Sequence, residues 1–172
     1  RFFPRKPRPL QDTVIKSSAS VNPPALVIIE APTGIGKTEL AFFIADGWLQ
    51  HGSQNGIYIA MPTTATSNQM HDRATKFICT RFGKQVEPML VHSQALLKQE
   101  EILTVTKNSA ETDLGSNDRA ADLSWFLPRK RSLLAPFGVG TVDQALMSVL
   151  QTKHFFVRLL GLHQKVVIFD EV

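Results

Sequence analysis

Short apolar runs alternate with polar stretches along this chain, and the alternation predicts strands that alternate with helices. The strand-like runs lie at 26–29, 56–61, 89–92, 132–136, 139–141 and 165–172. The first and the last of them are rich in Val and Ile, which is typical of buried parallel strands.

Apolar residues at helical spacing predict helices between these strands. The residues expected to face inward are Leu40, Phe43, Ile44 and Trp48 after residue 38, Met70, Ala74, Phe77 and Ile78 within 65–81, and Val142, Ala145, Leu146, Val149 and Leu150 after residue 141. A short helical or extended piece is expected at 10–17. Together these elements predict a three-layer α/β domain around a mainly parallel sheet.

The composition adds limits to this picture. Of the 172 residues, 43% are apolar and 20% are charged, which is ordinary for a globular protein. No apolar run is long enough to span a membrane, so we expect a cytoplasmic protein. Cys79 is the single cysteine, which excludes an internal disulfide and a metal cluster built from cysteines. The net charge of +4 is compatible with a polyanionic partner.

The chain divides by composition into two parts. Residues 1–24 are rich in Pro, Arg and Lys and predict a linker, whereas 25–172 predict one domain with a mobile loop at 106–120. The chain begins without a methionine and ends on an Asp-Glu motif. We therefore expect the front portion of one domain of a longer protein.

Residues 31–38 carry the clearest chemical signal, because they predict a phosphate-binding loop between a strand and a helix. Gly34 and Gly36 let the backbone approach a phosphate closely, and the helix dipole favours an anion there. Lys37 would reach the β- and γ-phosphates, and the Thr38 hydroxyl would bind Mg²⁺. The residues expected to hold the nucleotide in this loop are Thr33, Gly34, Ile35, Gly36, Lys37 and Thr38.

Two adjacent carboxylates follow the last strand-like run. We expect Asp170 to bind the Mg²⁺ and Glu171 to act as the general base toward water. An adjacent Asp-Glu pair favours hydrolysis over phosphoryl transfer to a bound substrate. The alternative is a solvated turn after a strand.

Parallel sheets gather their ligands beyond the carboxyl ends of the strands. This rule predicts that 31–38, 62–64, 140–143 and 170–171 lie at one edge of the sheet. The segments at 62–64 and 140–143 offer hydroxyls and helix amides that suit a second phosphate chain without reading bases. The alternative for each is an ordinary helix cap.

The order of these motifs resembles the first RecA-like domain of superfamily 2 helicases, which is a phosphate-loop NTPase fold. More narrowly, it is similar to the helicase part of CRISPR-associated helicase-nucleases of type I interference systems. The stretches that carry the resemblance are 7–11, 29–39, 60–66, 91–93, 129–136, 139–146 and 167–172.

The resemblance implies roles for individual residues. Gln11 would recognise adenine and so select ATP, and Ala31 is common in this group where other phosphate loops have Gly. The residues that would contact DNA are Pro62, Thr63, Thr64, Gly140 and Thr141. Position 64 frequently holds Arg in the family, so Thr64 implies a weaker grip on phosphate. The dipeptide His71-Asp72 is expected to be a coincidence rather than part of the family's HD nuclease site, because no second cluster of ligands accompanies it.

The resemblance further implies an ATP- and Mg²⁺-dependent single-stranded DNA translocase of CRISPR type I interference, with this chain as its ATP-binding lobe. The implied partners are single-stranded DNA, a CRISPR surveillance complex, a second RecA-like domain and an HD nuclease domain. Lys37 and Glu171 would be the catalytic residues, and the isolated chain should hydrolyse ATP weakly. An RNA-directed superfamily 2 helicase and a non-hydrolysing ATP-binding scaffold remain alternatives.

Overall fold

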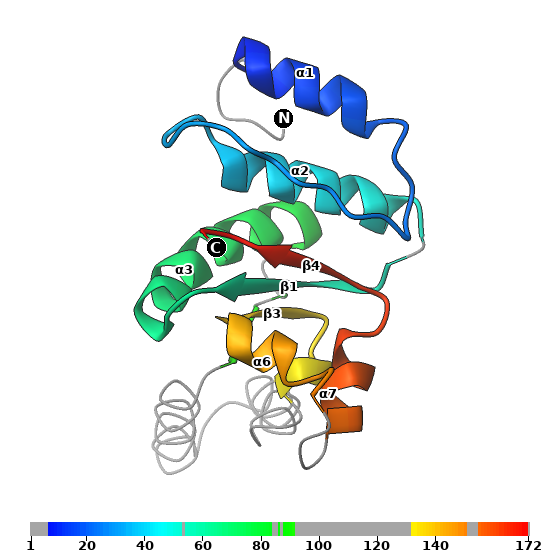
Figure 1. Cartoon of the computed structure of the whole chain (residues 1–172), viewed down its shortest axis with the longest axis vertical. Helices are drawn as coiled ribbons and strands as arrows, with labels where there is room; N and C mark the ends of the chain where they lie inside the picture. Colours follow the sequence, from blue (N-terminus) through cyan, green and yellow to red (C-terminus); the bar gives the residue numbers. More distant parts are fainter. Residues whose placement is uncertain are drawn as a thin grey trace, which may run out of the picture. The chain divides into compact units, whose positions relative to one another are not determined.

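The computed structural model describes residues 7–52, 54–83, 86, 88–91, 132–150 and 155–171 (Figure 1). The chain divides into two compact units, an N-terminal unit of residues 1–55 and a sheet unit of residues 56–172. The loop expected at 106–120 and the basic residues at 129–131 lie outside the described residues.

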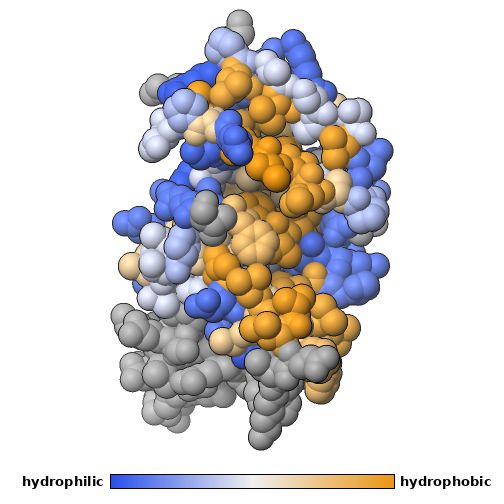
Figure 2. Space-filling view, viewed as in Figure 1, coloured by the Kyte–Doolittle hydropathy of each residue, from blue (hydrophilic) through white to orange (hydrophobic). Residues whose placement is uncertain are grey.

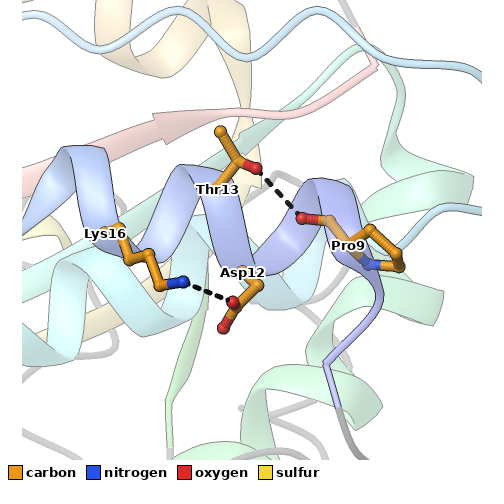
Figure 3. A network of polar contacts seen from close by, with 4 residues as sticks. All are labelled: Pro9, Asp12, Thr13 and Lys16. Atoms are coloured by element: carbon orange, nitrogen blue, oxygen red, sulfur yellow. Dashed lines mark hydrogen bonds and ion pairs between the residues drawn. The ribbon is translucent and has the colours of Figure 1, made fainter.

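The described part of the N-terminal unit contains two helices, α1 (Pro9–Ser18) and α2 (Lys37–Gln50). A proline in its first turn suits the start of α1, because the missing amide hydrogen has no partner within the helix. On the surface of α1, Lys16 pairs with Asp12 at 2.9 Å, and the Thr13 hydroxyl donates to the Pro9 carbonyl at 3.1 Å (Figure 3). The piece expected at 10–17 is therefore a helix.

The prediction of a buried strand at 26–29 is wrong. These residues are irregular, and the side chains of Leu26 and Ile28 are 86% and 74% exposed. A strand exists only where a neighbouring strand supplies hydrogen bonds to its backbone. The described part of the N-terminal unit contains no such strand, so the apolar composition of the run was not sufficient.

Among its described residues, the sheet unit contains four parallel strands: β1 (Gly56–Met61), β2 (Met89–Val91), β3 (Phe137–Thr141) and β4 (Lys165–Phe169). Their spatial order is β2-β3-β1-β4. β1 lies inside the sheet, all six of its residues are buried, and its bounds match the run expected at 56–61. The expected parallel sheet is confirmed.

Helices cover both faces of this sheet (Figure 1). α3 (Thr64–Phe82) packs on one face, where the Phe82 ring lies 5.0 Å from the Phe137 ring of β3. On the opposite face, Tyr58 of β1 packs in one apolar cluster with Ala145 of α6 (Val142–Leu146) and Leu133 of the 3₁₀ turn η1 (Ser132–Leu134). α7 (Phe155–Leu162) contacts η1 and α6. The expected three-layer arrangement is therefore present within the sheet unit.

Two local expectations in the sheet unit are wrong. The run at 132–136 forms the turn η1 rather than a strand. The helix after residue 141 ends at Leu146, because the Ser148 hydroxyl and the backbone beyond it turn back onto the helix carbonyls. Leu146, Val149 and Leu150 consequently are 48%, 69% and 56% exposed instead of facing inward. Figure 2 shows this apolar surface, which continues over α7.

No helix in the described part of the chain is long and apolar enough to cross a membrane.

Candidate nucleotide and nucleic-acid site

The phosphate loop lies in the N-terminal unit and ends where α2 begins. Gly34 and Gly36 have φ angles of 78° and 91°, in the left-handed region that side chains other than glycine rarely adopt. The Gly36 carbonyl accepts the first backbone hydrogen bond of α2, from the Leu40 amide at 3.1 Å. The two glycines therefore turn the backbone sharply into the helix, which points the first amides of α2 toward the loop.

Lys37 and Thr38 are the first two residues of α2, directly after the loop. The Lys37 ammonium donates to the Ala31 carbonyl at 2.7 Å, which connects the two ends of the loop. Thr38 is 8% exposed on the first turn of α2. An ammonium, a hydroxyl and the amides of a helix N-terminus form a donor set that fits a triphosphate with its Mg²⁺.

Gln11 lies beside this loop. Its side-chain oxygen accepts the Arg8 amide at 2.9 Å, and its side-chain nitrogen lies 2.5 Å from the place where a Cβ on Gly36 would stand. Gln11 is only 8% exposed although it is polar, so its amide is held in one direction. The residue expected to recognise adenine is thus adjacent to the residues expected to hold the phosphates.

Arg8 is a contact of the loop that sequence reasoning missed. Its guanidinium donates to the Gly34 carbonyl at 2.9 Å. The sequence places Arg8 among other cations and prolines, which suggested only a linker. Its position directly before the first turn of α1 was the available signal, since that residue is fixed by the helix start.

The two carboxylates follow β4 in the sheet unit. The Asp170 amide donates to the Ala60 carbonyl of β1 at 3.2 Å, and Asp170 is 8% exposed. Glu171 is exposed and has a φ angle of 60°. A residue with a side chain in this conformation is strained by about 1 kcal/mol or more. Asp170 is therefore anchored to the end of the sheet, while Glu171 turns away from the strand direction into solvent.

The strand register brings three of the four expected segments to one edge of the sheet. Met61 pairs with Thr141, and Ala60 pairs with Phe169, so 62–64 and 170–171 follow the same ends of neighbouring parallel strands, and 140–143 spans that end of β3. The fourth segment, the phosphate loop, belongs to the N-terminal unit.

The residues expected to contact DNA differ in exposure. Pro62, Thr63 and Thr64 are exposed, and the Thr63 hydroxyl caps α3 by accepting the Thr66 amide at 3.2 Å. Gly140 and Thr141 are buried, with Thr141 9% exposed. The edge therefore presents 62–64 to solvent and holds 140–141 in the core beneath.

Tyr58 is a second residue that sequence reasoning missed. Its side chain is fully buried, and its hydroxyl donates to the Thr141 carbonyl at 3.0 Å. Burial raises the pKa of the Tyr58 phenol well above its ordinary value, and the Arg158 charge lowers that pKa by less. The available signal was the pair of glycines at 138 and 140. Glycines at alternate positions leave one face of a strand without side chains, so that a large side chain of a neighbouring strand fits there.

His71 has a contact within the fold. Its Nε2 lies 2.8 Å from the Pro88 carbonyl, which connects α3 to the segment before β2. Within the ranges that the structure describes, no three His, Cys, Asp or Glu side chains gather into a metal site.

A phosphate loop before a helix with an amide beside it, and an acidic pair after a strand of a parallel sheet, are features of a helicase-type nucleotide-binding domain. The sequence profile of DEAD/DEAH box helicases matches residues 8–172, and the chain belongs to this family. The narrower resemblance is confirmed as well. The chain is 42% identical, over 99% of its length, to the CRISPR-associated endonuclease/helicase Cas3 of Thermus thermophilus, and 35% identical to a Cas3 of Streptococcus thermophilus.

Solved structures agree with these relatives. The crystal structure of T. fusca Cas3-ATP matches 97% of this chain with 38% identity and a TM-score of 0.77. A structure described as a CRISPR RNA-guided surveillance complex, pre-nicking, matches with 34% identity and a TM-score of 0.63. This chain spans 19% of the length of each of the two curated relatives and 18% of the T. fusca chain.

Proposed function

We propose that this chain is the ATP-binding lobe of an ATP-dependent single-stranded DNA translocase of CRISPR type I interference. The observation that carries the proposal is the position of the Gln11 amide beside Gly36 of the loop, inside the N-terminal unit: its nitrogen lies 2.5 Å from the place where a Cβ on Gly36 would stand. This closeness supports the proposal, because Gln11 is the residue expected to recognise adenine and the chain belongs to the helicase family. Similarity to Cas3 proteins over nearly the whole chain supports the choice of pathway.

Individual residues of the chain have separate roles in binding and hydrolysing ATP. The loop amides and Lys37 bind the phosphates, and the Gln11 amide reads the adenine edge. Thr38 and Asp170 would hold Mg²⁺, which supplies charge neutralisation at the phosphates. Glu171 accepts a proton from the attacking water. A second RecA-like domain would add arginines that stabilise the transition state.

The exposed segment at 62–64 is the proposed contact with DNA. Its hydroxyls and the first amides of α3 suit phosphate oxygens, which are present in any sequence. The protein is further proposed to be cytoplasmic, to work with a CRISPR surveillance complex and to act together with an HD nuclease domain. The relatives are about five times as long as this chain, which leaves room for these further domains.

ATP hydrolysis by the full-length protein tests the proposal. We expect strong stimulation by single-stranded DNA, little by RNA, and loss of turnover in Glu171→Gln with ATP binding retained. The variant keeps the size of the side chain and removes only its basicity. Stimulation by RNA alone would replace the DNA assignment. Unchanged low turnover in Glu171→Gln, with ATP bound, would indicate a non-hydrolysing scaffold.

A further inference from the structure

The proposed contact with DNA requires that the segment at 62–64 keep a fixed position at the edge of the sheet. The segment at 62–64 continues β1, and the segment at 140–141 ends β3. Backbone pairing holds the strands together only as far as Met61 and Thr141. Thr141 is thus held by its backbone beside Met61, and the segment at 62–64 begins directly beyond this last pair.

Tyr58 spans the two strands at this place. It stands on β1 opposite Gly138 of β3, and its ring runs along β3 toward Thr141. A Cβ on Gly138 would lie 3.3 Å from the ring, and a Cβ on Gly140 would lie 2.5 Å from the hydroxyl. Both glycines thus leave space for the Tyr58 side chain, which explains why glycine occupies these two alternate positions of β3.

The hydrogen bond to Thr141 fixes the direction of a peptide plane. Because the peptide is planar and trans, holding the Thr141 carbonyl toward Tyr58 turns the following amide to the opposite side. The amide in question belongs to Val142, the first residue of α6. Arg158 of α7 holds the same helix further on, since its guanidinium donates to the Gln144 side chain at 3.2 Å.

We propose that Tyr58 is a positioning residue for nucleic acid: it holds Thr141, the ladder partner of Met61, and so supports the adjoining segment at 62–64 without touching DNA. The inference rests on the proposed function. It also assigns Gly140 a steric role, because the residue is buried and admits the Tyr58 hydroxyl.

The test is the single-stranded DNA dependence of ATP hydrolysis by the full-length protein and its Tyr58→Phe variant, titrated with oligo(dT). Tyr58→Phe removes one oxygen atom and keeps the ring. Ser148→Ala is the matched control, because it also removes a buried hydroxyl that donates to a backbone carbonyl, at the far end of α6. Melting of each protein measures the loss of stability, and binding of labelled oligo(dT) on ice keeps a destabilised variant measurable.

We expect Tyr58→Phe to raise the half-saturating DNA concentration about 3- to 10-fold, the range for one lost hydrogen bond, with the rate at saturating DNA unchanged. Ser148→Ala should leave that concentration unchanged at a similar loss of melting temperature. The inference on Tyr58 would be overturned if Tyr58→Phe and the wild type had the same half-saturating DNA concentration, or if Ser148→Ala raised that concentration as much as Tyr58→Phe. Neither result would contradict the proposed function. A wild type that neither binds DNA nor responds to it would overturn the proposed function itself.

Discussion

The Gln11 amide nitrogen lies 2.5 Å from the place where a Cβ on Gly36 would stand. Glycine at 36 therefore serves two purposes. Its φ of 91° turns the loop into α2, and its missing side chain leaves space for Gln11. The phosphate loop and the expected adenine-recognising side chain are fitted to each other within the N-terminal unit.

Gly36→Ala should reduce ATP affinity by more than about tenfold. The substitution adds left-handed backbone strain of about 1–2 kcal/mol, and its methyl would also displace Gln11. Equilibrium binding of a fluorescent ATP analogue to the full-length protein measures the effect.

Gly52→Ala is the control for left-handed backbone strain outside the loop. Gly52 has a similar φ of 79°, but no atom lies within 4 Å of its added Cβ, and it stands outside the loop. We expect Gly52→Ala to lower the melting temperature and to leave ATP affinity unchanged. Equal affinities in the two variants would show that Gln11 does not depend on the space at Gly36.

Substitutions of three threonines on or beside α3 should separate helix capping from DNA contact. Thr63→Ala removes the cap and should cost about 1 kcal/mol of stability, in addition to weakening DNA binding. Thr64→Ala should weaken DNA binding with a stability change below about 0.5 kcal/mol, because the residue is exposed. Thr80→Ala lies near the other end of the helix and is the control. We expect it to leave DNA affinity unchanged and to change stability by less than about 0.5 kcal/mol.

Melting curves and oligo(dT) binding of the three variants provide the measurement. Normal DNA affinity in both Thr63→Ala and Thr64→Ala would mean that the segment at 62–64 serves only as the start of α3.

Lys165 should make stability depend on pH in the alkaline range. Burial lowers the pKa of its ammonium to about 8 from 10.5, while the ammonium donates to the Leu133 and Ala135 carbonyls. Between these two values only the unfolded chain keeps the proton, so raising the pH stabilises the folded state. Below about pH 8 both states are protonated and the effect is constant.

The comparison with Lys165→Met isolates this group. The stability of the wild type relative to the variant should rise by roughly 1 to 3 kcal/mol between about pH 8 and about pH 10.5. Thermal melting of both full-length proteins across that range measures the difference. A difference that stays constant or falls would show that the ammonium is hydrated in the folded protein.

Some elements follow from a few adjacent residues and were predictable. β1 has its expected bounds, because an apolar run stands between Gly56 and the Pro62 break. α3 starts where Thr63 can cap it. The run at 26–29 has equally strong strand composition and forms no strand, because strand formation depends on a partner that composition does not supply.

The sequence by itself determined the local chemistry of this protein: the glycines of the phosphate loop, its lysine and threonine, and the acidic pair after the last strand. These features depend on steric freedom and side-chain type within a few residues, which the sequence states directly. Only the tertiary structure placed Gln11 and Arg8 beside the loop and joined Tyr58 to Thr141 across 83 positions. Such contacts depend on strand register and helix packing, which bring distant residues together through the energy of the whole fold rather than through any local preference.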